Sequence, residues 1–374
     1  MTVTLSWGAL FLYCCVVLSV SGSKILFVSF TPSPSHQKPF QEIWRTLTAK
    51  GHEMHVITPN PLVNHTYANL IQYDISDVYA WAAKMNQLKK KDIKYSLQKP
   101  NFLHTFLKEF AVNRGWHAVH EYTFQLPEVK RLLDTQSSFD AVIVEWLYPT
   151  AAALAGYYRA PLIGICSLGA PTNGLDEIGN ILNPVVTPDQ NVPIGRSDFS
   201  FRDRLLSALY SVFIRLYYHW RIVPTEDRTV RKYLGDDIPY LGDITRNISL
   251  LLLNRNQISH RLMSVVPGIV EFGGLKYDKI VQELEPGLKH FLDNSKNGVV
   301  YFSMGAAIKQ LAFLSPQQID VFRTVLGELP YNVVWKWDNE TMDEKPDNVF
   351  ISSWINQTAV LGKKPLSVKF RAQL

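Results

Sequence analysis

The alternation of strand-like and helix-like segments at the start of the chain constrains its fold most strongly. Residues 24–30 form a continuous β-branched and aromatic run, typical of a strand that is buried on both faces. Residues 37–50 carry apolar side chains at helical spacing, and Gly51 favours the end of a helix there. Residues 53–58 predict a second strand after that helix. Two strands joined by a helix and short loops lie parallel, so the sequence predicts an α/β fold.

Three further apolar runs extend this pattern. Residues 139–145, 162–165 and 248–253 each predict a buried strand. A stretch rich in Pro, Gly and Asn over residues 167–197 indicates a long loop. The helical segments between the strands are expected at residues 77–134, 151–158 and 201–233.

A second series of elements begins after residue 275. Ser315, with Gln318 three residues later, indicates the capping box of a helix. Trp335 and Trp337 share one face of a strand, and we interpret them as packing residues. The expected helices are residues 280–294 and 315–326, and the expected strands are residues 299–303, 332–337 and 348–352.

Three strands are fewer than the roughly five or six of a complete doubly wound domain. The sequence therefore predicts two Rossmann-like α/β domains, of which the second is incomplete. The predicted ranges are 23–275 for the first domain, 276–362 for the second and 363–374 for a tail without a clear period.

The first segment of the chain is apolar and carries no charged side chain. Residues 1–22 end in small residues and predict a secretory signal peptide, with an uncleaved N-terminal anchor as the alternative. Asn-X-Ser/Thr triplets fit the same compartment, and Asn64 and Asn339 are the favoured glycosylation sites. Asn247 is expected at the start of a buried strand, and Asn356 near a ligand site. The expected location is the lumen of the endoplasmic reticulum, without a C-terminal membrane anchor.

Several functional classes are not indicated. Lys and Arg are scattered and the net charge is only +5, so nucleic acid is not an expected partner. No Gly-rich dinucleotide loop follows residues 24–30, which argues against a dehydrogenase. No metal-ligand cluster is evident, so no metal or cofactor is expected. Cys166 is interpreted as a small buried side chain.

His36 is the first candidate catalytic residue. Residues 31–36, with two prolines and three hydroxyl residues, predict a loop. His36 ends this loop beyond the carboxyl end of the first strand, where open α/β sheets bind their ligands. An imidazole there could act as a general base. The alternative is a solvated or capping histidine of a loop.

Several segments together resemble the UDP-glucuronosyltransferase branch of the UDP-glycosyltransferases, in an insect-like form. The resemblance runs from about residue 24 to residue 362, and its order and spacing make it specific. It implies a GT-B fold, in which two Rossmann-like domains face a cleft. The segments that carry it are Ser35-His36, GHEMHVITP, FDAVIVE, NILNPVVTP, ISLLLLN, Phe272-Gly273-Gly274-Leu275, VVYFSMG, VVWKW and NVFISSWINQTAVLG.

The resemblance assigns roles on the acceptor side. It implies that His36 is the base and that a carboxylate at the end of the strand 139–145 orients it. The family has Asp there, whereas this chain has Glu145, which is longer by a methylene. Asp140 is the fallback, although a turn role at the strand start fits it better. Candidates for an apolar acceptor pocket, or plain core residues, are Phe102, Phe106, Trp116 and Tyr122.

On the donor side the resemblance implies that Ser303 and Gly305 approach the diphosphate of the UDP-sugar. Trp354 would stack on uracil and Gln357 would bind the nucleoside, and the alternative for Trp354 is a core aromatic. The family often has Ser where Ala306 stands. The His-Gly-Gly and Asp-Gln elements of the family signature do not occur in this chain.

Two functional hypotheses follow. The first is an inverting transferase that moves glucose or glucuronate from a UDP-sugar to a small lipophilic acceptor, with a detoxification role. The second is an inactive, shortened form that binds acceptors or pairs with full-length family members in homo- or hetero-oligomers. Because the donor signature is not found, we expect little or no activity from the chain by itself.

Overall fold

The computed structural model describes residues 22–88, 102–194, 199–256, 258, 262–274, 283–305 and 310–362. The predicted signal peptide, apart from Gly22, and the tail 363–374 lie outside these residues. The chain divides into two units, Met1–Tyr277 and Asp278–Leu374. This division is close to the boundary expected after residue 275.

The larger unit is built on a seven-stranded sheet in the order β3-β2-β1-β4-β5-β6-β7. Every neighbouring pair of strands is parallel, which confirms the predicted βαβ arrangement. The strands are β1 Lys24–Val28, β2 Glu53–Thr58, β3 Leu70–Asp74, β4 Ala141–Glu145, β5 Leu162–Cys166, β6 Ile248–Leu253 and β7 Ile269–Glu271.

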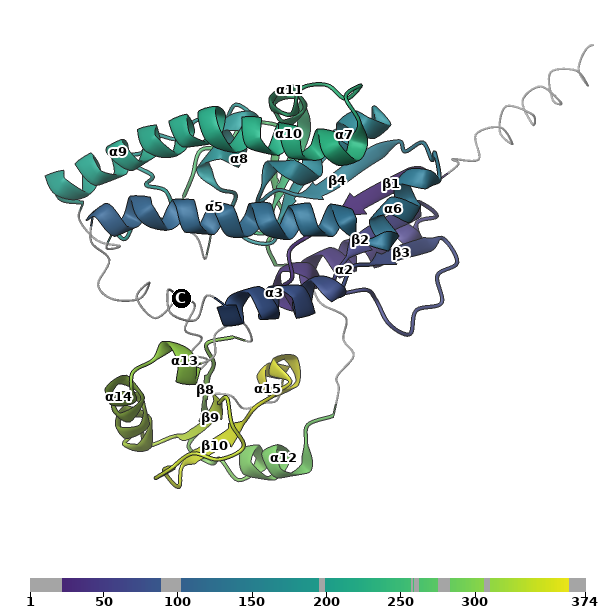
Figure 1. The fold of residues 1–374 in the computed structure, drawn as a ribbon. Coiled ribbons are helices and arrows are strands. Elements are labelled where there is room, and N and C mark those ends of the chain that lie inside the picture. Colours follow the sequence, from purple (N-terminus) through teal and green to yellow (C-terminus); the bar gives the residue numbers. More distant parts are fainter. Residues whose placement is uncertain are drawn as a thin grey trace, which may run out of the picture. The chain divides into compact units, whose positions relative to one another are not determined.

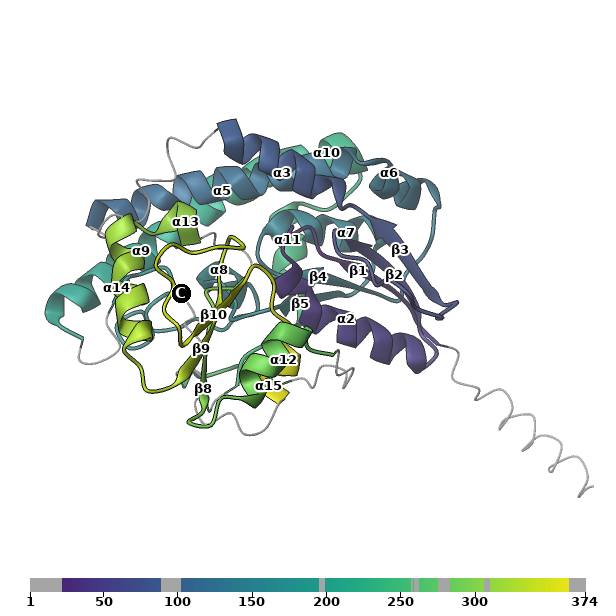
Figure 2. The ribbon, with the colours of Figure 1, turned by 90° about the horizontal axis from the view of Figure 1, so that it is seen from below.

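Helices cover both faces of this sheet (Figures 1 and 2). Figure 2 shows α2 on one face and α3, α5, α6, α7, α10 and α11 on the other. The helices are α2 Pro34–Ala49, α3 Asp77–Leu88, α5 Phe102–Gln125, α6 Pro127–Asp134, the 3-10 helix η1 Pro149–Ala152, α7 Ala153–Tyr158, α8 Thr172–Glu177, α9 Phe201–Tyr217, the π-helix η2 Tyr218–Ile222, α10 Val223–Leu234 and α11 Leu241–Arg246.

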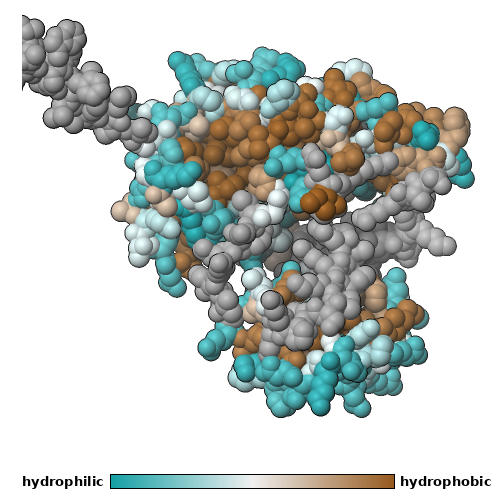
Figure 3. Space-filling model, turned by 180° about the vertical axis from the view of Figure 1, so that it is seen from behind, coloured by the Kyte–Doolittle hydropathy of each residue, from teal (hydrophilic) through white to brown (hydrophobic). Residues whose placement is uncertain are grey.

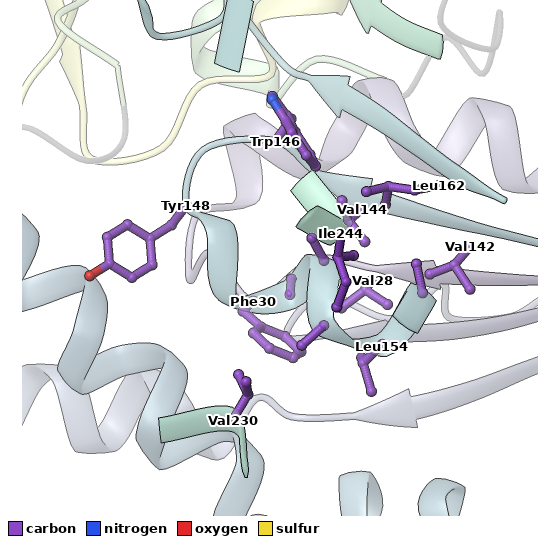
Figure 4. Close-up of a cluster of buried hydrophobic side chains, with 14 of the residues drawn as sticks. Val28, Phe30, Val142, Val144, Trp146, Tyr148, Leu154, Leu162, Val230 and Ile244 are labelled. Carbon is purple, nitrogen blue, oxygen red and sulfur yellow. The ribbon is translucent and has the colours of Figure 1, made fainter. Parts of the chain in front are cut away.

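Alternation along β1 divides the core into two layers. Phe27 packs with Phe40 and Trp44 of α2, whereas Val28 belongs to the cluster on the opposite face. The cluster on the opposite face joins the sheet to α6, α7, α10 and α11. Its members labelled in Figure 4 are Val28, Phe30, Val142, Val144, Trp146, Tyr148, Leu154, Leu162, Val230 and Ile244.

The smaller unit has a three-stranded parallel sheet in the order β10-β9-β8. Residues of α14 pack on one face and residues of α12 and α15 on the other. Trp335 and Trp337 are buried in the first of these clusters, which confirms their packing role. The elements are α12 Pro286–Asp293, β8 Val299–Phe302, α13 Gln310–Phe313, α14 Pro316–Gly327, β9 Asn332–Lys336, β10 Val349–Ser352 and α15 Gln357–Gly362.

A capping box and a proline mark where two helices begin. Ser315 and Gln318 form the predicted reciprocal capping box at the start of α14. The start of α2 differs from the prediction, because Pro34 occupies its first turn and Ser33 is its N-cap residue. His36 therefore lies in the first turn of a helix rather than in the preceding loop.

Three other predictions on the elements need correction. The strand β3 was not predicted, because this short strand at the sheet edge buries only Leu70 and Tyr73 and shows neither an apolar run nor a regular alternation. The expected loop 167–197 contains α8, a helix of six residues that is too short to show a period. Within the described part of the expected helix 280–294, residues 283–285 are not helical and α12 begins at Pro286, whose ring suits a first turn, while residues 280–282 lie outside the described residues.

The surface of the larger unit is mixed. Seen from behind, hydrophobic patches lie among hydrophilic residues of this unit (Figure 3). Among the residues that the structure describes, no helix is both long and apolar enough to cross a membrane.

Candidate active site

The carboxyl edge of the larger sheet brings the acceptor-side residues together. The strand order reverses between β1 and β4, and such a switch point is where open α/β sheets bind ligands. Ser29 follows β1, Glu145 ends β4 and Ser167 follows β5. Because these three strands are neighbours and parallel, their ends meet at one place.

His36 and Glu145 form a hydrogen-bonded pair at this edge. Nδ1 of His36 lies 3.3 Å from Oε1 of Glu145 and 2.8 Å from Oγ of Ser167. Oε2 of Glu145 accepts a hydrogen bond of 2.5 Å from the Ser29 hydroxyl. The longer side chain of Glu145 thus still reaches the histidine. Glu145 is buried, with only 4% of its surface exposed. Asp140 lies at the other end of the strand, where its carboxylate accepts from the backbone N–H of Lys24 at 2.8 Å.

The contacts of His36 leave one side of its ring open to a ligand. Its side chain is a quarter exposed, whereas Glu145 is buried. Within the described part of the chain, Glu145 and Ser167 both engage Nδ1, so Nε2 is the nitrogen that can meet a bound hydroxyl. This arrangement of base and orienting carboxylate suits proton abstraction.

A pocket of about 260 Å³ opens beside His36 within the larger unit. Its apolar lining includes Trp116 of α5, Trp146 after β4 and Ile214 of α9. Glu109 and Asp189 add carboxyl groups to the wall. A mostly apolar cavity with a few polar groups is typical of a small-molecule site.

Of the aromatic residues considered from the sequence, Trp116 lines this pocket. Phe106 instead packs on Phe213, with ring centroids 5.1 Å apart, and Tyr122 stacks on Trp81 at 4.8 Å. The side chain of Phe102 lies outside the described residues. The sequence analysis missed Trp146 and Tyr148, although both follow the carboxyl end of β4 directly and could have been found by that position.

A buried carboxylate supports the pocket wall from behind. Glu226 accepts hydrogen bonds from the hydroxyls of Tyr148 at 2.9 Å and Thr150 at 3.0 Å. Nδ1 of His117 lies 2.7 Å from the same carboxylate. The hydrogen bond to Glu226 raises the pKa of His117 above its ordinary value, and partial burial opposes this.

The raised pKa of His117 predicts a pH-dependent contribution to stability. His117 binds its proton more tightly in the folded state than in the unfolded state. The resulting stabilisation is complete below the unfolded pKa of about 6.5 and is lost as the pH rises through the folded pKa. We therefore expect His117→Gln to lower the free energy of unfolding more at acidic than at alkaline pH in urea titrations. His219→Gln serves as the control, because burial lowers the pKa of His219. An equal effect of His117→Gln at both pH values would contradict the prediction.

The donor-side residues follow two strands of the smaller unit. Ser303 comes after β8 and Trp354 after β10, and the two strands flank β9 in a parallel sheet. The Ser303 hydroxyl accepts from the N–H of Gly305 at 3.1 Å, and the φ of 86° at Gly305 favours glycine. Trp354 is 69% exposed, so it is not a core aromatic. Gln357 is the first residue of α15, and Ala306 lies outside the described residues.

The glycosylation candidates are accessible. Asn64 is exposed between β2 and β3, and Asn339 is exposed after β9. Asn247 is exposed as well, immediately before β6, so burial does not distinguish it from them. The side chain of Asn356 accepts from the backbone N–H of Ala359 at 3.2 Å.

The fold of the chain is similar to that of solved GT-B glycosyltransferases. One similar solved structure is the glycosyltransferase of kitacinnamycin, with a TM-score of 0.53 and 16% identity over 94% of this chain and 75% of that one. Another is a UDP-glucose: anthocyanidin 3-O-glucosyltransferase in complex with UDP, with a TM-score of 0.50 and 13% identity over 93% of this chain and 76% of that one. At these identities the likeness shows a shared fold.

The family follows from the sequence as a whole. A family model described as UDP-glucoronosyl and UDP-glucosyl transferase matches residues 23–370. The chain belongs to this family, which confirms the resemblance drawn from its motifs.

Two curated relatives show how much of the family length the chain spans. It is 27% identical over 354 residues to UDP-glucosyltransferase 2 of Dactylopius coccus, covering 93% of this chain and 66% of that protein. It is 24% identical over 376 residues to the ecdysteroid UDP-glucosyltransferase of Spodoptera littoralis nuclear polyhedrosis virus, covering 94% of this chain and 70% of that protein. The chain therefore spans about two thirds of the length of these relatives.

Proposed function

We propose that the chain carries the acceptor site and part of the donor site of an inverting transferase that uses a UDP-sugar. The observation that carries this proposal is the pair of His36 and Glu145 beside the 260 Å³ pocket, with Nδ1 3.3 Å from the carboxylate. The pocket would bind a small lipophilic alcohol or phenol. The names of the two relatives favour glucose over glucuronate as the transferred sugar.

In the proposed reaction, Nε2 of His36 removes the proton of the acceptor hydroxyl as its oxygen attacks the anomeric carbon of the sugar. The bond between that carbon and the diphosphate oxygen breaks, and UDP leaves with the bonding electrons. Attack from the opposite side inverts the configuration at the anomeric carbon. Buried Glu145 stabilises the imidazolium that forms, while Ser29 and Ser167 hold the carboxylate and the ring in place.

On the donor side, Trp354 would provide a stacking surface for uracil and Gln357 a polar contact to the nucleoside. The exposed position of Trp354 supports this role. Ser303 and the backbone at Gly305 would approach the diphosphate. No metal or cofactor enters this proposal.

We also propose that the chain works in the lumen of the secretory pathway, with glycans on Asn64 and Asn339. Their exposure supports attachment there. Removal of N-linked glycans from the secreted or lumenal chain should lower its mass, and the double variant Asn64→Gln/Asn339→Gln should show no such change. A mass shift that persists in the double variant would reject this choice of sites.

Calorimetry with UDP tests the donor site directly. We expect binding by the chain, and Trp354→Ala should weaken it about 5- to 150-fold, because stacking on a base contributes on this scale. Trp220→Ala, at an exposed tryptophan of the larger unit, should leave the affinity for UDP unchanged.

Two results would count against this donor site. Equal affinity of the wild type and Trp354→Ala would reject stacking on this residue. If the wild type does not bind UDP at millimolar concentration, the second hypothesis gains support. The chain would then be an acceptor-binding or regulatory partner of full-length family members. Calorimetric titration with lipophilic alcohols, compared between the wild type and Trp116→Ala, would test that role.

A further inference from the structure

The outward face of α9 and η2 carries a row of exposed apolar side chains. Successive members are three or four residues apart, so they share one face of the helix. Each is between 43% and 78% exposed. We define this row as the apolar stripe, and its residues are Phe201, Leu205, Leu209, Val212, Leu216 and Trp220.

The opposite face of α9 is already buried in the protein. Tyr210 and Ile214 are core residues, and the Tyr210 hydroxyl donates to Glu109 of α5 at 2.9 Å. The inner face of α9 therefore fixes the orientation of the helix. The exposure of the apolar stripe is a consequence of that orientation. A helix that is apolar on both faces is typical of one with a second apolar partner.

The neighbouring helix α5 extends this surface. Leu103, Leu107 and Phe110 are exposed at helical spacing. The Phe110 ring contacts Phe213 and Tyr217 of α9, with centroids 5.8 and 4.8 Å apart. The two helices lie side by side in Figure 1. The exposed row on α5 therefore adjoins the apolar stripe.

The charges around the apolar stripe are mostly positive. Arg202, Arg204 and Arg221 are exposed, whereas Asp203 binds Ser200 in the capping box of α9. An apolar face with aromatic residues at its ends and arginines beside it is typical of helices that lie in the headgroup region of a bilayer. The positive rim is complementary to anionic lipids.

We propose that the apolar stripe binds peripherally to the surface of an anionic lipid bilayer. The helices of this surface also line the acceptor pocket, through Ile214 of α9, Ile222 of η2 and Trp116 of α5. A lipophilic molecule in the bilayer would then lie about one helix diameter, roughly 10 Å, from the pocket. The proposed binding itself does not depend on the transfer reaction.

Sedimentation with vesicles tests the proposal on the full chain. We expect binding to vesicles of phosphatidylcholine with phosphatidylserine, weaker binding to phosphatidylcholine alone, and loss of binding at high salt. Val212→Ser/Trp220→Ser should lower the partition coefficient by about tenfold or more, since both side chains would leave the bilayer. Arg202→Gln and Arg204→Gln should each lower it by about fivefold.

A matched pair of exposed valines provides the control. Val321→Ser/Val325→Ser on α14 removes similar exposed apolar area from the smaller unit and should leave vesicle binding unchanged. Far-UV circular dichroism would verify that all variants fold. Equal binding to neutral and anionic vesicles would overturn the proposal, as would wild-type binding by the Val212→Ser/Trp220→Ser variant. The proposal would also be overturned if the wild-type chain does not bind vesicles but forms a dimer, and the Val212→Ser/Trp220→Ser variant is a monomer.

Discussion

Replacing His36 with Ala is expected to lower kcat/KM for sugar transfer by about 10²- to 10⁴-fold, the range that general bases contribute. The imidazole beside the pocket can accept the hydroxyl proton at Nε2, because its Nδ1 is already held by Glu145 and Ser167. The assay follows UDP release from the chain. If the chain alone does not turn over, the same assay uses a fusion of this chain to the C-terminal part of the Dactylopius coccus relative.

Acceptor binding separates chemistry from folding in this test. Calorimetric titration should give similar acceptor affinities for the wild type and His36→Ala, because Trp116 and Trp146 line the pocket in both. Glu145→Gln retains the size of the side chain but loses its charge, so it should also slow transfer without abolishing acceptor binding. Unchanged kcat/KM in His36→Ala would rule out the proposed base.

The sequence predicted the inner strands of the larger sheet and the strands of the smaller one, but not the edge strands β3 and β7, for a physical reason. A parallel strand that is covered on both faces favours an uninterrupted apolar run, and β1, β4, β5 and β6 each contain one, whereas β2 mixes apolar residues with Glu53 and His55. The same logic located His36 beside the carboxyl end of a predicted strand, whereas the resemblance to the family pointed to Glu145. Their contact spans 109 positions of the sequence, and the resemblance to the family suggested it.

Ser29 and Ser167 show where sequence reasoning stopped. Their hydroxyls bind Glu145 and His36 over 116 and 131 positions. A serine after a strand is common in loops, and nothing local reveals which distant side chain it will meet. Only the order of β1, β4 and β5 in the sheet, which the sequence did not specify, brings these groups together.

The start of α2 was missed for a different reason. Two prolines and several hydroxyl residues between Thr31 and His36 indicated a loop. Proline is tolerated in the first turn of a helix, however, and the structure uses Pro34 in this way. This difference affects the site, since it places His36 on a helix that is held by the core.

Phe27→Ala is expected to lower the free energy of unfolding of the larger unit by about 3–5 kcal/mol, as for other buried phenylalanines. Phe27 is fully buried in β1, and its ring lies 5.4 Å from that of Phe40 and 5.3 Å from that of Trp44. Both partners belong to α2. Removal of the ring leaves a cavity between the sheet and the helix that carries His36.

Urea unfolding followed by circular dichroism would measure this loss, with Phe27→Leu as the matched control at less than about 1.5 kcal/mol. A loss below about 1 kcal/mol for Phe27→Ala would show that α2 does not depend on this contact. Because His36 lies in the first turn of α2, we also expect Phe27→Ala to slow transfer under conditions where it stays folded. A misplacement of about 1 Å is enough to impair a catalytic base. Phe27→Leu fills most of the space of the ring and should therefore largely retain the rate. The stability of the α2 layer and the position of the base would then depend on the same aromatic contact.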